Sequence, residues 1–567
     1  MIGETQMNRR TFAKRVVGAA SYPLAGHTAR VFAAASDTAD LVLTNGVMVT
    51  MSDKRPSAQA MAVRRGRILA VGTNPQIEKL ASRDTKVIDL AGRCVSPGLV
   101  DAHSHVVGFG QMQLKYVLLR PPKVDSIESL KNALAKAAKD KPAGEWIVGR
   151  GFASFKEGRF PRRRDLDEAV PNHPTLIIHW GGQFGAANTL ALEKAGLLRA
   201  DVKDPYGGKF LRDRRTGLPD GALLHYPAIY AVYQPKLDDA EKVECAAWGM
   251  NQLASQGVTC VHDNFCHPEY AKAYVRLERR GQLPCRARVY PYVKNLQQCR
   301  LVVERIRRYE GPLVRLQGIK LAVDGYALMY NVPREHRHLD IPMHPRPQFN
   351  EMIATIHQGD LQADVHAVGD KGVDWTLAAF AKAAGSAAEC RRRRHRIEHF
   401  PFRKLDSIKR AADLGAPVCL QPNYIEVRAD AFLEKLGRSG KALVDTMLPI
   451  RTFMNQGVHL AYGADVPAFP SHSPMASIRS AMERRTASRR KLDAAEAVSF
   501  TEALRHHTID GAYAAFDEND LGSLEPGKHA DFVIWNQDLR KVRTPRDTVA
   551  LKPRATYLAG KAVYEAT

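Results

Sequence analysis

Two histidines at strand spacing offer the first chemistry in the chain. His103 and His105 follow an apolar segment, Leu99-Val100, which begins directly after the turn signal Pro97-Gly98. Side chains alternate along a strand, so both imidazoles would leave the same face, where two neutral imidazoles can share a divalent metal ion. Taken alone, such a pair is more often two hydrogen-bonded histidines at the edge of a loop. The remaining sequence decides between these two interpretations.

Other apolar, strand-like segments also end in residue types that bind metals. These ends are His262-Asp263, Lys320, His366, His399 and Asp465. A random set of polar strand ends would be mostly Ser, Thr and Asn, whereas this set is nearly all metal ligands. In a barrel of parallel strands, the catalytic residues lie at the C-terminal strand ends. The sequence therefore predicts a metal site assembled from several strands.

The elements that must position these residues alternate between strand and helix. After the segment that ends in His103, strand-like segments cover residues 175–179, 258–262, 287–293, 318–323, 363–368, 395–399, 418–421 and 460–465, with helical patterns such as 375–384 and 404–414 between most of them. This alternation predicts an α/β fold, for which a (β/α)8 TIM-like barrel over residues 98–520 is the best candidate. The strand candidates exceed by one the number that a barrel needs. We therefore expect an insertion over the active face within residues 111–237, which are punctuated by Pro, Gly and Arg.

Both ends of the chain predict short strands. Residues 38–97 contain short apolar segments separated by turns, and Asn45-Gly46 is a strong hairpin signal between residues 41–43 and 47–49. Residues 521–567 have the same character. We expect one small β-sandwich built from both chain ends, with the barrel inserted between its halves.

The bulk composition narrows the class of protein. The chain has 567 residues, of which 45% are hydrophobic and 25% charged, as in globular proteins, and no segment approaches the roughly 18 unbroken apolar residues of a membrane span. A net charge of +23 favours anionic partners, but the arginine runs 162–164 and 391–394 lack interleaved aromatics, so we expect no nucleic-acid partner. The eight cysteines form no Cys-x-x-Cys motif. A small-molecule substrate is the expected partner.

The N-terminus is similar to a twin-arginine export signal. Arg9-Arg10 is followed by Phe12 and Lys14, a modest apolar segment covers residues 16–25, and Ala33-Ala34-Ala35 offers a small-residue cleavage site. We therefore assign residues 1–37 to a signal, expect the twin-arginine export machinery as a partner, and expect a periplasmic or secreted protein. The alternative is a chance Arg-Arg pair in a cytoplasmic protein.

Seven short motifs occur in a fixed order from about Asp40 to the C-terminus. They cover residues 97–105, 257–263, 319–325, 366–370, 395–399, 463–465 and 522–531. Together they resemble the amidohydrolase superfamily, and within it the YtcJ-like branch that includes N-substituted formamide deformylase. Each motif is unspecific alone, but their joint order is highly specific.

The resemblance implies a role for each of these residues. His103, His105, His366 and His399 would be metal ligands, and Asp465 would be both a metal-associated carboxylate and the proton shuttle. Lys320 matches a lysine that can be carboxylated to bridge two metals; the alternatives are a solvent-exposed lysine or a pair with Asp324. One or two divalent ions are implied, with zinc favoured by the ligand types and iron or manganese as alternatives.

One stretch departs from the family pattern. Many relatives carry Asp-Gly-His where this chain has Gly181-Gly182-Gln183, so we assign Gln183, together with Asp324, to the substrate pocket. The implied reaction is hydrolysis of a non-peptide carbon–nitrogen bond, such as an amide or N-formyl bond, by metal-activated water. The alternatives are an ester or lactone hydrolase, an aminohydrolase, or a non-catalytic barrel that only binds. By analogy with such barrels, a homodimer is one expected assembly.

Overall fold

The computed structural model describes residues 38–567, except residues 154, 306–309, 326 and 332–339. The expected export signal in residues 1–37 lies outside the described residues. Among the residues that are described, no helix is both long enough and apolar enough to cross a membrane.

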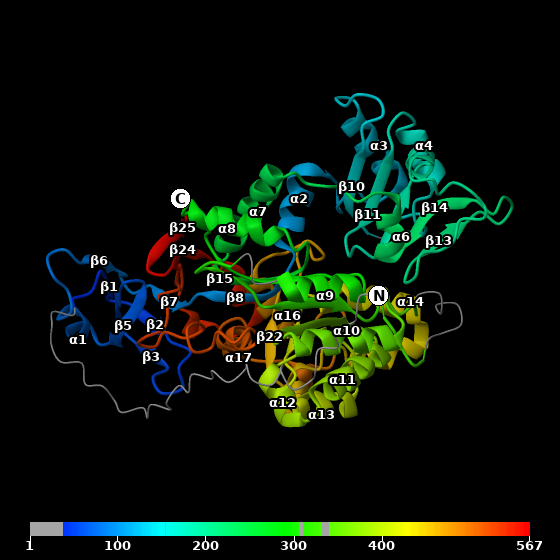
Figure 1. Ribbon diagram of the computed structural model, residues 1–567. Helices are drawn as coiled ribbons and strands as arrows, with labels where there is room; N and C mark the ends of the chain where they lie inside the picture. The colour runs from blue at the N-terminus through cyan, green and yellow to red at the C-terminus, as the bar shows by residue number, and fades with distance from the viewer. Residues whose placement is uncertain (1–37, 154, 306–309, 326, 332–339) are drawn as a thin grey trace, which may run out of the picture. The chain divides into compact units, whose positions relative to one another are not determined.

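Parallel strands joined by helices form the largest part of the chain (Figure 1). One sheet has the order β17-β16-β15-β8 and a second has the order β18-β19-β20-β21-β22, and every pairing in both sheets is parallel. The strands are β8 (Leu99–Ser104), β15 (Val258–Cys266), β16 (Arg286–Pro291), β17 (Val314–Leu316), β18 (Gly318–Ala322), β19 (Gln362–Ala367), β20 (Arg396–His399), β21 (Val418–Leu420) and β22 (Leu460–Tyr462). This is the α/β fold that the alternation of strands and helices predicts.

Helices stand between these strands and bury apolar faces against them. They are α2 (Val106–Lys115), α7 (Asp239–Ala254), α8 (Tyr270–Arg279), α9 (Leu296–Arg305), α10 (Arg346–Gln358), α11 (Asp370–Ala384), α12 (Ala387–Arg393), α13 (Leu405–Leu414), α14 (Tyr424–Asp445), α15 (Ile450–Asn455), α16 (Pro474–Glu483), α17 (Phe500–His506) and α18 (Ile509–Tyr513). The predicted helical patterns at 375–384 and 404–414 correspond to α11 and α13. A single large core of buried apolar residues joins the strands to these helices.

Backbone contacts join the two parallel sheets at two places. On one side, the residue after β16, Tyr292, bridges in parallel to Lys320 of β18. On the other side, the chain after β22 pairs with β8: the Asp465 amide donates to the His103 carbonyl at 2.7 Å, and the His105 amide donates to the Val466 carbonyl at 2.8 Å. These contacts bring the strand ends that carry the predicted ligands next to one another.

The ninth strand candidate, residues 175–179, belongs to a separate sheet. It forms β11 (Thr175–His179), which pairs in parallel with β10 and antiparallel with β12 in the order β13-β14-β12-β11-β10-β9. The other members are β9 (Val117–Leu118), β10 (Ile147–Phe152), β12 (Phe184–Ala187), β13 (Lys209–Arg212) and β14 (Pro219–Leu224), with α3 (Ile127–Ala138), α4 (Arg163–Ala169), α5 (Thr189–Lys194) and α6 (His225–Val232) (Figure 1). Counting residues 175–179 with the barrel strands is therefore wrong. The error arises because a buried strand has the same apolar sequence pattern in either sheet.

Strands from both chain ends share one sheet, in the order β25-β24-β23-β7-β2-β3. β7 from the first half pairs antiparallel with β23 from the second half. A four-stranded sheet, β5-β4-β1-β6, contributes to the same buried apolar cluster. The strands are β1 (Leu41–Thr44), β2 (Val47–Val49), β3 (Ser57–Ala58), β4 (Ala60–Arg64), β5 (Arg67–Gly72), β6 (Lys86–Asp89), β7 (Cys94–Pro97), β23 (Phe532–Trp535), β24 (Pro553–Leu558) and β25 (Lys561–Glu565), with the short helix α1 (Asn74–Glu78).

The predicted hairpin at Asn45-Gly46 is wrong. β1 pairs with β4 and β6, while β2 pairs with β3 and β7, so the turn passes the chain from one sheet to the other. Asn45 has a φ of 56°, as the turn signal requires, and a Cβ on Gly46 would lie 2.2 Å from Leu90 Cδ1. The two residues therefore make the turn, but packing against Leu90 and not strand pairing determines its direction.

Candidate metal centre

Eight residues that the sequence singled out line one cavity at the ends of the parallel strands. They are His103, His105, Gln183, Lys320, Asp324, His366, His399 and Asp465. The six-stranded sheet that contains β11 contributes to the same walls, through Arg150 of β10 and the segment between β11 and β12. The cavity thus combines the predicted ligands with residues from this separate sheet.

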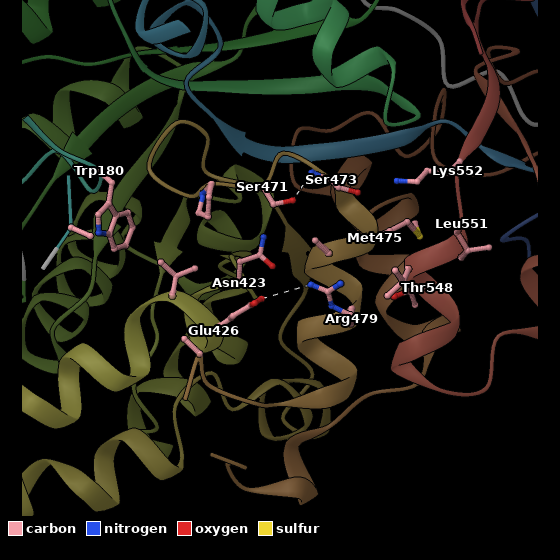
Figure 2. A pocket seen from close by; sticks show the side chains of 16 residues that line it. Trp180, Asn423, Glu426, Ser471, Ser473, Met475, Arg479, Thr548, Leu551 and Lys552 are labelled. Carbon is pink, nitrogen blue, oxygen red and sulfur yellow. Dashed lines mark hydrogen bonds and ion pairs between the residues drawn. The ribbon is translucent and has the colours of Figure 1, made fainter. Parts of the chain in front are cut away.

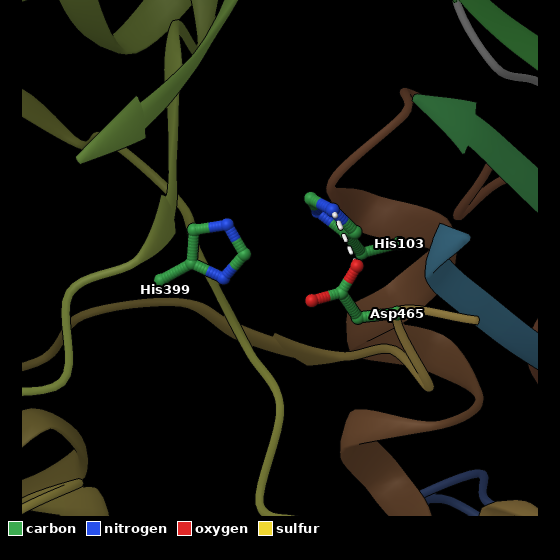
Figure 3. A group of neighbouring side chains, drawn as sticks. All are labelled: His103, His399 and Asp465. Atoms are coloured by element: carbon green, nitrogen blue, oxygen red, sulfur yellow. Dashed lines mark ion pairs between the residues drawn. The ribbon is translucent and has the colours of Figure 1, made fainter. Parts of the chain in front are cut away.

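Three of these side chains, drawn in Figure 3, lie close together. One candidate ligand atom from each of His103, His399 and Asp465 lies within 4.8 Å of the others. Asp465 Oδ1 lies 3.6 Å from His103 Nε2 and 3.0 Å from His105 Nε2. The His366 ring lies beside this group, with its centroid 4.4 Å from that of His399.

The backbone is bent at two of these positions. His399 has a φ of 79° and Asp465 a φ of 52°, in the left-handed region that residues with a Cβ seldom adopt. His399 is the last residue of β20, and Asp465 lies three residues after β22 ends at Tyr462. The side chains of both residues line the cavity. Strained conformations of this kind are retained mainly at functional sites.

Burial keeps three of the histidines, His103, His366 and His399, neutral. Desolvation, aided by neighbouring Lys320 and by the other imidazoles, holds the pKa of His103 well below its usual range. Desolvation likewise lowers the pKa of His366 and of His399. A neutral imidazole has a free lone pair, which is the form that a metal ion binds.

Further residues fix the orientation of the imidazoles. Glu398 accepts a hydrogen bond from His103 Nδ1, Gln421 Oε1 lies 2.6 Å from His399 Nδ1, and the Asn264 carbonyl oxygen lies 2.6 Å from His105 Nδ1. Each contact occupies Nδ1 and leaves Nε2 for the cavity. Such contacts set the tautomer and the angle of a metal-binding histidine.

The sequence analysis missed the buried ion network behind the histidines. Arg396 Nε donates to Glu398 at 2.7 Å, and its Nη2 donates to the Ala102 carbonyl at 2.7 Å. Arg396 and Glu398 flank Ile397 at strand spacing, so two charged residues on one face of a buried strand were the signal available. Neither side chain is exposed to solvent.

The environment of Lys320 differs from both expected alternatives. The lysine is buried, and its Nζ lies 3.1 Å from Asp364 Oδ1 on the adjacent strand, so it neither reaches solvent nor pairs with Asp324. Asp324 instead accepts hydrogen bonds from the backbone amides of Leu328, Val368 and Gly369. Burial and the neighbouring Glu398 raise the pKa of Asp364 to about 7, while Lys320 opposes this rise.

The donor set fits a divalent metal ion. Four histidines and two carboxylates, those of Asp324 and Asp465, line one cavity, and imidazole and carboxylate groups are ligands that zinc prefers. His366 Nε2 is buried 3.4 Å from Asp324 Oδ1 and makes no hydrogen bond to any described residue. A buried polar atom without a partner requires an explanation, and a bound metal ion supplies one.

A second, larger cavity shares no lining residue with this site. Figure 2 shows that it lies between α14, α16 and the segment around Thr548, and that Trp180, Asn423, Glu426 and Arg479 contribute to its walls. None of the candidate metal ligands lines it. Arg479 pairs there with Glu426 at 3.8 Å. Among the described residues, the candidate metal ligands therefore belong to the smaller cavity.

The fold and the donor set define a metal-dependent hydrolase, and comparison with known proteins agrees. The model of the amidohydrolase family matches residues 86–564, and the chain belongs to this family. The chain is similar to Protein LONG AFTER FAR-RED 3 of Arabidopsis thaliana, with 30% identity over 93% of this chain and 92% of that protein. It is also similar to N-substituted formamide deformylase of Arthrobacter pascens, with 27% identity over 93% of this chain and 99% of that protein.

A solved structure shares the fold. An uncharacterized metal-dependent hydrolase from Pyrococcus horikoshii matches with a TM-score of 0.70 and 22% identity, over 88% of this chain and 98% of the other. The family match over residues 86–564 identifies the protein as an amidohydrolase, and the solved structure agrees with its fold.

Proposed function

We propose that this amidohydrolase cleaves a non-peptide carbon–nitrogen bond of a small molecule, such as an amide or N-formyl bond. The observation that carries the proposal is the position of Asp465, whose Oδ1 lies 3.0 Å from His105 Nε2 and 3.6 Å from His103 Nε2. The same cavity is lined by His366 and His399. The similarity to N-substituted formamide deformylase supports a substrate of the amide type.

Some side chains of the cavity would bind the metal ion, and Asp465 would also transfer a proton. His103, His105, His366, His399 and Asp465 would hold the metal ion, for which zinc fits the donor types best. When bound, such an ion supplies Lewis-acid activation of water and of the substrate. Asp465 Oδ1 would accept a proton from the water molecule that attacks the substrate carbon, and would then return this proton to the leaving nitrogen. Carboxylation of Lys320 stays a prediction, as does the number of metal ions.

Two parts of the fold belong to the same proposal. The Tyr292–Lys320 bridge and the backbone bonds between β8 and the end of β22 support closure of the two parallel sheets into one (β/α)8 barrel. The apolar cluster shared by the two sheets near the chain ends supports a β-sandwich.

Export by the twin-arginine route is also part of the proposal. It rests on Arg9-Arg10 in the sequence. A reporter fused to residues 1–37 should leave the cytoplasm with Arg9-Arg10 intact and stay there when both arginines are replaced by lysine. Retention of the unaltered fusion would place the protein in the cytoplasm.

A substrate screen tests the proposed activity. Zinc-loaded protein should hydrolyse at least one compound in a panel of N-formyl, N-acyl and carbamate substrates. Asp465→Asn should keep the metal and lose most of the turnover, because the amide cannot accept a proton. Full activity in Asp465→Asn contradicts the proton-transfer role, and hydrolysis of esters or lactones alone assigns the site to the alternative chemistry.

A further inference from the structure

Two arginines in the metal-ligand cavity have no acidic partner among the described residues. Arg150 from β10 and Arg428 from α14 both line this cavity. The Nε atom of each is buried and makes no hydrogen bond. Arginine stays charged at every physiological pH, so each guanidinium brings a full positive charge to the wall of the cavity.

Arg428 is the more deeply buried of the two, with 6% of its surface exposed. Its guanidinium stacks 4.2 Å from the ring centroid of Trp180, and its Nη2 donates to Gln183 Oε1 at 3.3 Å. Stacking stabilises the flat face of the guanidinium, but it leaves most of the N–H edge without an acceptor. A buried charge without a counter-charge is costly, so its retention requires a binding partner.

The charges of Arg150, Arg428 and the Asp465 carboxylate all influence the pKa of Tyr226. Burial raises the pKa of the Tyr226 phenol, Asp465 adds to this rise, and both arginines oppose it. The Tyr226 side chain therefore lies within electrostatic range of all three charged groups. Tyr226 lines the cavity together with them. An anion held by the arginines would lie close to the metal ligands.

We propose that Arg150 and Arg428 bind a carboxylate of the substrate, so that the compound hydrolysed is an amide with a carboxylate near the scissile carbon–nitrogen bond. The planar guanidinium presents parallel N–H donors that match the two oxygens of a carboxylate. The walls next to the arginines are aromatic, from Tyr226, Phe265 and Tyr424, and they favour a compact ligand with an apolar part. This assignment rests on the proposed function, because it names the substrate class of the same site.

Binding of matched ligands tests the assignment without requiring turnover. The probes are N-acetylglycine with N-acetylglycinamide, and both enantiomers of N-acetylphenylalanine with their amides, titrated calorimetrically into zinc-loaded and metal-free protein. At least one carboxylate should bind tenfold or more tightly than its amide, since charge-assisted hydrogen bonds are worth roughly 10- to 100-fold in affinity. Equal affinity within every pair, including no binding of either member, overturns the proposal.

Two variants and one control separate charge recognition from packing. Arg428→Met and Arg150→Met should each weaken carboxylate binding by roughly 10- to 100-fold and leave amide binding within about threefold. Arg479→Met, in the cavity of Figure 2, is the control and should change neither affinity. An equal loss for carboxylate and amide would show that the arginines only support the fold. A loss of carboxylate binding in Arg479→Met alone would move the anion to the other cavity and overturn the proposal.

Gly181 provides a second test that leaves both arginines in place. A Cβ at Gly181 would lie 2.5 Å from Arg428 Nη2, the flexible end of that side chain. Gly181→Asp should therefore supply an internal carboxylate that occupies Arg428 and abolishes the preference for carboxylate ligands. Gly181→Asn has the same size without the charge and should keep the preference. The same response in both variants contradicts charge recognition.

The outcomes also separate this proposal from the proposed function. Carboxylate-selective binding without hydrolysis of any compound would support the arginine site and contradict the proposed hydrolase activity. Hydrolysis of neutral and anionic amides at equal rates, with no selectivity in binding, would contradict the arginine site and support the proposed hydrolase activity.

Discussion

Replacing Glu398 by Gln isolates the contribution of the buried network to metal binding. Glu398 accepts hydrogen bonds from His103 Nδ1 and from Arg396 Nε. The amide keeps the shape and one acceptor but removes the negative charge. Contacts of this kind with a metal-binding histidine are worth roughly 10- to 100-fold in metal affinity. This factor corresponds to about 1.4–2.7 kcal/mol of binding free energy.

The same substitution should also destabilise the fold. Removing the charge of one partner in a buried ion pair costs about 3–5 kcal/mol. We expect the lower end of this range, because Arg396 keeps the Ala102 carbonyl at 2.7 Å and Asp364 at 3.6 Å. Urea unfolding measures the stability change.

Competition with a zinc-binding dye measures the metal affinity of Glu398→Gln. Glu351→Gln is the matched control, because Glu351 is exposed and, among the residues that the structure describes, pairs only with Arg300 on the surface. The control should keep both the metal affinity and the unfolding midpoint. Wild-type zinc affinity in Glu398→Gln, despite lower stability, would refute the orienting role of this glutamate.

Three further variants test other parts of the structure. Lys320→Ala should lose metal or activity and be partly rescued by a small carboxylate, and wild-type metal content and rate would count against carboxylation. Asp531→Asn breaks the buried pair with Arg286 (2.7 Å) and should lower the free energy of unfolding by about 3–5 kcal/mol in urea, whereas a change below about 1 kcal/mol would mean that the pair behaves like an exposed one. Arg451 lowers the pKa of Glu502 from 4.5 to about 2. The contribution of this ion pair to the stability of the fold is therefore complete above pH 4.5 and is lost as the pH falls toward 2. The stability difference between the wild type and Glu502→Gln should therefore narrow between pH 6 and pH 3, and a constant difference would contradict this pairing.

The candidate ligands could be predicted from the sequence because each of them follows an apolar segment that is typical of a buried strand. His103, His366, His399 and Asp465 all line one cavity, as their positions after such segments indicated. The same signal could not assign residues 175–179, since a buried strand has one pattern in any sheet. The tertiary partner of each strand is not encoded in its own periodicity.

Buried polar networks were beyond prediction because their partners come from distant strands. Arg396 contacts Glu398 on its own strand, but its other neighbours include Ala102, His262 and Asp364 on other strands. The partner of Lys320 likewise depends on the register between β18 and β19, which sets Lys320 opposite Asp364. Only the three-dimensional arrangement specifies these pairs.

Metal content measured on purified protein tests the central claim most directly. Protein produced with zinc in the medium and dialysed against metal-free buffer should retain at least one divalent ion per chain. The double variant His103→Asn with His399→Asn should retain almost none while keeping its fold by circular dichroism. Negligible metal in the wild-type protein, or equal metal in the double variant, would contradict a metal centre at these residues.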